Sequence, residues 1–481
     1  MTTLDDYLAN VIQRGDQGSD LLAKGCAPTL RNCPHVKIIK GPTQNVGVLE
    51  LPETYDVVVH SATGDPKITD VHAHARSVVT RLCTQAQQLG VTPVAFADVI
   101  DSRTGDLKML EAAVTGLVDE ANKKGLAIMN GENAILGDRV LAEANIMGTM
   151  ISIISKEKAL LLPRHLRHNK IASARFDPAG NYVFINADGV GTKTEIYERA
   201  RFSIGALEDF AAMNLDDASK LRATARVLSG VVEFTGLMPL DVLTSHARQL
   251  GKELDISFIL QQENAAGRIS TNHLFTYNLS GAVVSTIDKA KAQTPLQANP
   301  GDYLVAIAGK PNPRSNGITG KRKAMEQLFG PNYQYHPQGR HILEYLATPS
   351  TMLYPVFRLL IGQGLATNVY HMSGGAYKGK LAKPLAHHGL FVRLEKLFPP
   401  DPRELMLAGA NFTSAEEAYA KWPMGNEGFI TTQQPLVAID RIKAMGLQGK
   451  SVGQIQKAVD GKTGVELEAL PGKVVYFSGK E

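Results

Sequence analysis

Cysteine and tryptophan are scarce in this sequence, which has three cysteines, one tryptophan and 6% aromatic residues among 481. Cys26, Cys33 and Cys83 form no C-x-x-C pair, so we expect neither a disulfide framework nor a zinc site of that type. The spacing leaves open a metal shared by Cys26, Cys33 and His35. A reducing compartment is therefore the expected environment.

Long apolar runs and blocks of lysine and arginine are also lacking. No segment approaches the length of a membrane span, and residues 1–20 have no apolar signal core. We therefore expect a cytoplasmic protein without a membrane anchor. The net charge of +4 suits an anionic metabolite, whereas no interleaving of aromatic and basic residues favours nucleic acid. The length allows about two to four domains.

One stretch carries the strongest chemical signal. Residues 182–187 are apolar and β-branched, which predicts a buried strand. Gly189 and Gly191 allow the loop that follows to point its amide N–H groups at a phosphate. Asp188 is a hard oxygen ligand suited to Mg²⁺, and Lys193 adds a compact positive charge. The stretch indicates nucleotide chemistry, although it is not the Walker pattern G-x-x-x-x-G-K-[ST].

A second acidic motif, Met-Asn-Leu-Asp-Asp, ends at Asp217 on an expected helix, 24 residues after Lys193. A plain glycine turn and two solvated acids are the alternative interpretation of the two motifs. Together, Asp-Gly-Val-Gly-Thr-Lys and Met-Asn-Leu-Asp-Asp resemble aminoimidazole ribonucleotide synthetase, also called phosphoribosylformylglycinamidine cyclo-ligase. Its superfamily includes formylglycinamidine ribonucleotide synthetase, selenophosphate synthetase and thiamine-monophosphate kinase, and its members use ATP.

Three later segments extend the resemblance. Residues 314–317 are similar to the family's His-Ser-Asn-Gly loop, with Arg314 in place of histidine. Residues 371–375 are similar to its Gly-Gly-Gly loop, and residues 422–428 to its Phe-Asn-Met-Gly-x-Gly stretch. The arginine and the Trp-Pro pair at 422–423 depart from the family pattern.

An internal repeat is indicated by matches at consistent offsets. Lys67 ends a strand and loop 126 residues before Lys193, and residues 130–134 match residues 261–265 at an offset of 131. In the family, two N-terminal domains pair in a dimer. We therefore expect a mixed α+β and α/β fold, in which two tandem synthetase-type N-terminal sheet domains pair as an internal pseudo-dimer before one C-terminal α/β domain.

The expected boundaries follow from the repeat. They are an N-terminal extension at 1–49, a degenerate first copy at 50–160, a linker at 161–180, an ATP-binding second copy at 181–295 and a C-terminal synthetase domain at 296–481. The internal pairing removes the need for the family's dimer without excluding a homo-oligomer.

The two copies differ in the residues that the chemistry needs. Copy 1 has Ala62 where the sequence offset places Asp188, and Gln85 aligns with Asp217. Copy 1 keeps Glu132 within Asn-Gly-Glu-Asn, close to the family's Gly-Gly-Glu-Thr. The resemblance thus implies one composite ATP site, with residues from both copies.

The resemblance implies the following site. Glu132, Asp188 and Asp217 would bind Mg²⁺. Lys193 and His371 are the catalytic candidates, and a core histidine is the alternative interpretation of His371. The expected ATP-binding residues are Glu132, Asn133, Asp188, Gly189, Gly191, Thr192, Lys193, Ser315, Asn316, Gly317, Ser373, Gly374 and Gly375.

The implied function is that of an ATP-dependent ligase of purine biosynthesis. It would convert formylglycinamidine ribonucleotide, a small-molecule substrate, to aminoimidazole ribonucleotide through a phosphorylated amide. The alternatives are a paralogue that phosphorylates another amide or acyl substrate, and a non-catalytic ATP-binding scaffold protein.

Overall fold

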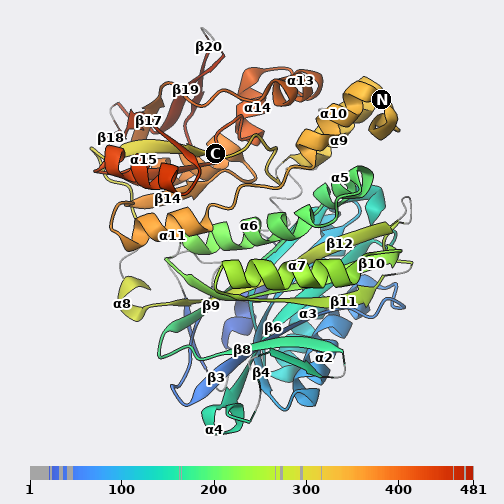
Figure 1. Cartoon of the computed structure of the whole chain (residues 1–481). Coiled ribbons are helices and arrows are strands. Elements are labelled where there is room, and N and C mark those ends of the chain that lie inside the picture. The colour runs from blue at the N-terminus through green and yellow to red at the C-terminus, as the bar shows by residue number, and fades with distance from the viewer. Residues whose placement is uncertain are drawn as a thin grey trace. The chain divides into compact units, whose positions relative to one another are not determined.

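The computed structural model describes residues 21, 24–31, 36–40, 47–161, 163, 165–168, 170–220, 222–265, 267–270, 275–292, 296–315, 317–458, 460–470 and 473–479. The chain divides into two compact units (Figure 1). Unit 1 comprises residues 1–198 and 223–293, and unit 2 comprises residues 199–222 and 294–481. Each unit is described by itself.

The first sheet of unit 1 has six strands in the order β5-β4-β6-β3-β8-β7. β4 and β5 are parallel, whereas β6 runs antiparallel to both β4 and β3. Apolar residues fill β3 and β6 almost without alternation because both faces of these strands are buried. The strands are β3 (Tyr55–Thr63), β4 (Thr92–Ser102), β5 (Ala127–Ile135), β6 (Ala144–Ser155), β7 (His165–His168) and β8 (Ile171–Phe176).

The second sheet of unit 1 has six strands in the order β1-β2-β9-β12-β10-β11. β10 and β11 are parallel, and β12 runs antiparallel to both β10 and β9. Four strands of each sheet, β3 to β6 in the first and β9 to β12 in the second, can be numbered in chain order. Both sheets then arrange these four strands in the order third, second, fourth, first. The strands are β1 (Lys37–Lys40), β2 (Gly47–Glu50), β9 (Tyr182–Gly189), β10 (Thr224–Gly236), β11 (Ser257–Asn264) and β12 (Phe275–Ile287).

Helices cover the outer faces of these sheets (Figure 1). α2 (Val71–Gln88) and α3 (Leu107–Lys124) begin where the side chains of Asp70 and Asp106 accept hydrogen bonds from amides of the first turn. α3 ends at Gly125, whose φ of 68° favours glycine. α7 (Leu240–Glu253) packs on β11. The shorter helices are η1 (Ala27–Arg31), η2 (Gly137–Arg139), α4 (Lys156–Ala159), α5 (Lys193–Ala200) and α8 (Lys289–Ala292).

The inner faces of the two sheets form a common core. Val57 and Val59 of β3 belong to the same buried cluster as Ile185 and Ala187 of β9. Burial of each of these valine and isoleucine side chains contributes about 1.5–3 kcal/mol. The expected fold, two sheet domains that pair within one chain, is confirmed.

The expected linker differs from the structure. Residues 161–180 contain β7 and β8, and β8 pairs with β3 to extend the first sheet. The sequence predicts no strand here because arginine and histidine dominate residues 164–168. Residues 199–222, expected in the second copy, group with unit 2. The exact copy boundaries stay a prediction.

Unit 2 has two four-stranded sheets, in the orders β14-β16-β13-β17 and β18-β15-β19-β20. α11 (Tyr354–Gly362) and α15 (Pro435–Ala444) share a buried core with the first of them, whose strands are β13 (Tyr303–Ala308), β14 (Asn368–His371), β16 (Gly428–Thr432) and β17 (Gln448–Gln454). The second has β15 (Leu390–Leu394), β18 (Gln456–Lys457), β19 (Gly464–Leu470) and β20 (Lys473–Phe477). This α/β unit matches the expected class of C-terminal domain.

The other helices of unit 2 are α6 (Gly205–Ser219), α9 (Ile318–Phe329), η3 (Tyr333–Tyr335), α10 (Pro337–Leu346), η4 (Tyr377–Ala382), α12 (Lys383–His387), α13 (Pro402–Asn411) and α14 (Ala415–Lys421). Gly317 is the N-terminal cap of α9, so the loop at residues 314–317 leads directly into a helix. Over the described residues, every helix is too short or too polar to cross a membrane.

Candidate functional site

The glycine loop of unit 1 begins at the end of β9, whose last residues are Asp188 and Gly189. Gly189 lies against β12, where a Cβ would come within 2.7 Å of Ser280 Oγ. Gly191 has a φ of 60°, a left-handed conformation that favours glycine. The Asp188 side chain accepts a hydrogen bond from the Gly189 amide at 2.7 Å. Both glycines are therefore required by the backbone of this turn.

Lys193 is the first residue of α5, and its side chain is fully buried. Its Nζ lies 5.6 Å from the centre of the Tyr197 ring. Thr192 is also buried. The loop is thus tightly packed, with its predicted phosphate-binding cation inside the protein.

Arg139 of copy 1 anchors α5 from the other sheet domain. Its guanidinium donates to both carboxylate oxygens of Glu198 at 2.8 and 2.9 Å and to Thr194 Oγ1 at 2.8 Å. All three side chains are buried, so the paired charges and the fork geometry fix the position of this helix. Sequence reasoning missed Arg139, which lies in a segment without a motif.

The strand that carries Glu132 and Asn133 lies beside β9. Asn130 Oδ1 accepts a hydrogen bond from the Ala187 amide at 2.8 Å, which joins β5 to the strand that ends in the glycine loop. Asn133 is buried, and neither polar atom of its amide has a hydrogen-bond partner among the described residues. A buried amide without partners is a candidate ligand contact. The structure therefore brings the strands of the predicted composite site together.

The strand register keeps the expected counterpart of Asp188. Asp188 lies opposite Gly281, and Ala62 lies opposite Gly148. The two glycines correspond, because each follows by three residues an asparagine, Asn145 or Asn278, that donates to a buried acid of the other sheet. Ala62 therefore occupies the place of Asp188 in copy 1, as the sequence offset predicts.

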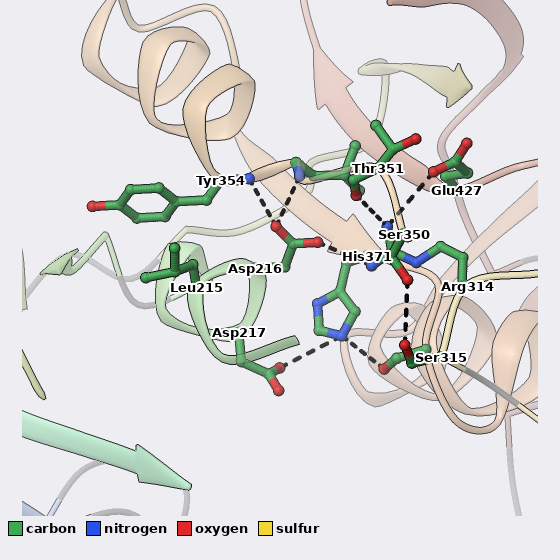
Figure 2. Close-up of polar contacts among 12 residues, drawn as sticks. Leu215, Asp216, Asp217, Arg314, Ser315, Ser350, Thr351, Tyr354, His371 and Glu427 are labelled. Carbon is green, nitrogen blue, oxygen red and sulfur yellow. Dashed lines mark hydrogen bonds and ion pairs between the residues drawn. The ribbon is translucent and has the colours of Figure 1, made fainter. Parts of the chain in front are cut away.

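In unit 2, Asp216 of α6 is fully buried, and both of its carboxylate oxygens accept hydrogen bonds (Figure 2). Its Oδ1 accepts the amides of Leu353 and Tyr354 at 2.9 and 2.8 Å. Its Oδ2 accepts from the Arg314 guanidinium at 2.9 Å. Burial raises the pKa of Asp216 to about 6, although Arg314 opposes the shift. These contacts identify Asp216 as an anchor for Arg314 and for the start of α11.

Arg314 extends this network to the other loops. It donates to the Thr351 carbonyl at 2.8 Å, and its guanidinium lies 3.8 Å from Glu427 Oε2. Glu427 Oε1 accepts the Gly309 amide at 2.9 Å. The arginine that replaces the family's histidine is therefore a structural cation, which the sequence could not show because its acidic partner lies 98 positions away.

Asp217, next to Asp216, faces a different environment. It accepts from Lys220 Nζ at 2.7 Å, and its Oδ1 lies 3.7 Å from His371 Nε2 (Figure 2). Burial favours a raised pKa for Asp217, but the charges of Lys220 and Lys380 lower it well below its ordinary range. Asp217 is therefore ionised at neutral pH, as a cation ligand must be.

His371 ends β14 beside the second glycine loop. Its Nε2 lies 2.7 Å from Ser373 Oγ, and its Nδ1 is buried without a hydrogen-bond partner among the described residues. Burial and the charges of Lys220 and Lys380 lower the pKa of His371 well below its ordinary value, against the attraction of Asp217. The imidazole is therefore neutral at pH 7. Gly375 of the loop has a φ of 81°.

The remaining predicted residues lie at the start of α9. Ser315 Oγ lies 3.4 Å from Ser350 Oγ, and Asn316 lies outside the described residues. Gly317 has a φ of 64°, and a Cβ there would come within 2.2 Å of Trp422 Nε1. Lys321 Nζ, also buried, donates to the Pro313 carbonyl at 3.1 Å. The backbone of this loop is thus fixed from both sides.

The predicted metal ligands belong to different units. Glu132 and Asp188 lie in unit 1, and Asp217 lies in unit 2. Within the described ranges, no group of three or more histidine, cysteine, aspartate or glutamate side chains has a metal-binding arrangement. The oxygen chemistry of the three carboxylates suits Mg²⁺, and their role as ligands stays a prediction. Cys33 and His35 lie outside the described residues.

Comparison with known proteins supports the resemblance. No family model matches the chain. The phosphoribosylformylglycinamidine cyclo-ligase of Thermococcus gammatolerans is 25% identical over 283 residues, which cover 58% of this chain and 79% of that protein. The enzymes of the same name from Pyrococcus horikoshii (27% over 258 residues, 53% and 72%) and Pyrococcus furiosus (28% over 271 residues, 54% and 74%) are also similar.

Two solved structures are similar to the chain over more than half of its length. Thiamine-monophosphate kinase from Stenotrophomonas maltophilia has a TM-score of 0.43 and 12% identity, covering 65% of this chain and 94% of that one. Phosphoribosylformylglycinamidine synthase II from Thermotoga maritima has a TM-score of 0.39 and 9% identity, covering 61% and 43%. By its sequence, the protein is a distant relative of the phosphoribosylformylglycinamidine cyclo-ligases, and the motif-based resemblance is confirmed.

Proposed function

We propose that the protein is an ATP-dependent ligase that closes the imidazole ring of aminoimidazole ribonucleotide. The observation that carries this proposal is the retention of Asp188 and Gly189 at the end of β9 and of Gly191 and Lys193 in the turn and helix that follow, in a chain similar to proteins named cyclo-ligase. The glycines are required by close packing and by a positive φ, so the loop is a specific structure.

The reaction suits such a loop. The formyl amide oxygen would attack the γ-phosphorus of ATP, releasing ADP and turning a poor leaving group into phosphate. The amidine-side nitrogen would then attack the activated carbon, close the five-membered ring and expel phosphate. Phosphoryl transfer requires positioning and charge neutralisation more than covalent chemistry by the protein.

The residues of each unit have distinct proposed roles. In unit 1, the loop from Asp188 to Lys193 would bind the ATP phosphates, and Glu132 would contribute from the neighbouring strand. Mg²⁺ would supply charge neutralisation at the phosphates, with carboxylates as its ligands. In unit 2, His371 would accept a proton at Nε2, where the Asp217 carboxylate, 3.7 Å away, would stabilise the charged ring.

The decisive experiment incubates the purified chain with formylglycinamidine ribonucleotide, ATP and Mg²⁺ and measures the aminoimidazole product and ADP. We expect turnover, and a loss of about a hundredfold or more in Asp188→Ala, because such charge-stabilising groups contribute on that scale. Asp241→Ala, at an exposed position of α7, is the matched control and should retain full activity.

The alternatives give different results. ATP binding without turnover of this substrate would indicate a paralogue with another amide or acyl substrate. Absence of ATP binding would favour the scaffold interpretation. Glu132→Ala tests the composite site separately, and unchanged ATP binding and activity in this variant would contradict it.

A further inference from the structure

A pocket of about 530 Å³ lies in unit 1 among α7, β11 and β8, outside the glycine loop. Its floor is apolar and buried, formed by Ala247 of α7 together with Phe258, Ile259 and Leu260 of β11. Arg248 and Lys252 line it from exposed positions. The pocket thus combines an apolar base with a positively charged rim.

Because the two sheets of unit 1 have the same strand arrangement, the pocket has a counterpart on the other sheet. β8 pairs antiparallel with β3, as β2 pairs with β9. α7 and β11 follow β10 as α3 and β5 follow β4. The groove among α7, β11 and β8 therefore corresponds to the groove among α3, β5 and β2 on the other side of unit 1.

A short segment of the chain itself lies in that counterpart groove. Gly25 approaches α3 so closely that a Cβ would come within 2.4 Å of Val114 Cγ1. Thr29 Oγ1 accepts the amide of Ile128 on the edge of β5 at 2.9 Å. Cys26 joins the buried cluster of α2 and α3, and Leu30 packs against the core between the sheets. A groove between a helix and two strands of this kind therefore fits a turn of small and apolar residues that carries one hydroxyl acceptor.

We propose that the groove among α7, β11 and β8 is a docking site for a short apolar segment of a partner protein, flanked by acidic residues. The first half of this proposal rests on the segment seated in the counterpart groove. The second half rests on charge. The left-handed residues Gly125 and Asp255 end α3 and α7 with the same backbone hydrogen bonds. Val118 and Asn122 of α3 therefore stand at the positions of Arg248 and Lys252 in α7, and neither carries a charge. Arg248 and Lys252 would attract carboxylates at the two ends of the segment. The proposal is independent of the activity proposed above.

The probes are two fluorescein-labelled peptides whose sequences derive from residues 24–31. One, Glu-Gly-Ala-Ala-Pro-Thr-Leu-Glu, carries acidic ends, and the other, Lys-Gly-Ala-Ala-Pro-Thr-Leu-Arg, carries basic ends. Fluorescence polarisation with the full chain should show saturable binding of the acidic peptide, weakened by salt. The basic peptide should bind about tenfold more weakly, because exposed ion pairs contribute about 0.2–1 kcal/mol each.

Three variants distinguish the groove from the rest of the surface. Ala247→Trp should fill the pocket and abolish binding of the acidic peptide. Ser245→Trp, at an exposed position of the same helix, should leave it unchanged. The double variant Arg248→Glu, Lys252→Glu should reverse the preference between the two peptides. Thermal unfolding confirms that each variant is folded.

Other results would overturn the proposal. Absence of saturable binding by either peptide would do so, as would equal binding by wild type and Ala247→Trp. Binding of octanoate in the groove without binding of either peptide would assign the pocket to a small amphiphilic acid instead.

Discussion

At the scale of single residues, the neighbouring acids Asp216 and Asp217 show how one helical step separates structure from chemistry. Successive side chains on a helix point about 100° apart. Asp216 is therefore buried against Arg314 and the start of α11, whereas Asp217 faces Lys220 and His371. The sequence motif singled out Asp217 for function, and it could not reveal that its neighbour holds the loops.

We expect Asp216→Ala to destabilise unit 2 by about 3–5 kcal/mol, since it leaves a buried guanidinium and two buried amides without their acceptor. Asp217→Ala should cost about 1 kcal/mol or less, because its ion pair with Lys220 is partly exposed. Urea unfolding of both variants measures the difference, with wild type as reference. Equal losses would contradict the separate roles.

Asp98 predicts a pH dependence of the stability of unit 1. Burial raises the pKa of Asp98 to about 8, and neither carboxyl oxygen has a hydrogen-bond partner among the described residues. Burial also raises the pKa of Asp101 to about 7, against hydrogen bonds from Asn278 and Ser280. The folded state thus retains protons that the unfolded chain releases near pH 3.8.

This difference in bound protons means that the free energy of unfolding of unit 1 falls as the pH rises. The contribution of Asp98 is fully present below pH 3.8 and is lost as pH rises toward about 8, by about 1.4 kcal/mol per pH unit. Asp98→Asn should therefore flatten the fall in stability between about pH 5 and 8. Urea midpoints at these two pH values test it, with Asp138→Asn, at an exposed site, as control. An unchanged slope would show that Asp98 is ionised in the folded protein.

At the scale of elements, the strand and loop at 182–193 could be predicted because local chemistry decides them: β-branched residues form the strand and glycines form the turn. β7 and β8 could not, because their place in the sheet depends on β3, more than 100 residues away in sequence. The same reason hid the unit to which α6 belongs. The sequence predicts a helix here, inside the second copy, but its contacts lie in unit 2. The hydrophobic periodicity of a sequence depends on residues that are near one another along the chain. It does not show which sheet or helix an element packs against.

The close packing of the glycine loop against β12 gives a prediction at this scale. Gly189→Ala should weaken ATP binding about tenfold or more, because its Cβ would meet Ser280 Oγ at 2.7 Å and displace the strand end. Ser280→Gly in the same chain removes the clashing atoms and should restore most of the affinity. Isothermal titration with ATP measures both, and Ser280→Gly alone is the control. If the double variant binds as poorly as Gly189→Ala, the clash is not the cause.

At the scale of the whole molecule, two sheets of equal strand order carry unequal sites. Where copy 2 has Asp188, copy 1 has Ala62, which is fully buried and lies opposite Gly148 as Asp188 lies opposite Gly281. The methyl group of an alanine cannot replace a metal-binding carboxylate.

The second residue of the site is altered in the same half. Glu263, the counterpart of Glu132, is bound by the Arg81 guanidinium at 3.1 and 3.2 Å. Arg81 also donates to the carbonyls of Thr63 and Gly64, where β3 ends. An arginine of α2 thus occupies the turn that corresponds to the glycine loop, and it neutralises the acid that would otherwise face a ligand there.

We therefore expect one ATP per chain. Equilibrium dialysis with labelled ATP should reach a stoichiometry of one in wild type, and Asp188→Ala should reduce it to zero. Arg81→Ala should keep it at one, since removing the guanidinium exposes Glu263 without restoring a carboxylate at Ala62. Two sites in wild type, or one site that survives Asp188→Ala, would show that the decayed half still binds nucleotide.

Because the two halves share one core, loss of Arg81 is also expected to lower stability, by about 1–3 kcal/mol for the hydrogen bonds of a charged, partly buried group. A single ATP held by two paired domains of one chain would make this protein a covalently joined form of an arrangement that two separate subunits could otherwise supply.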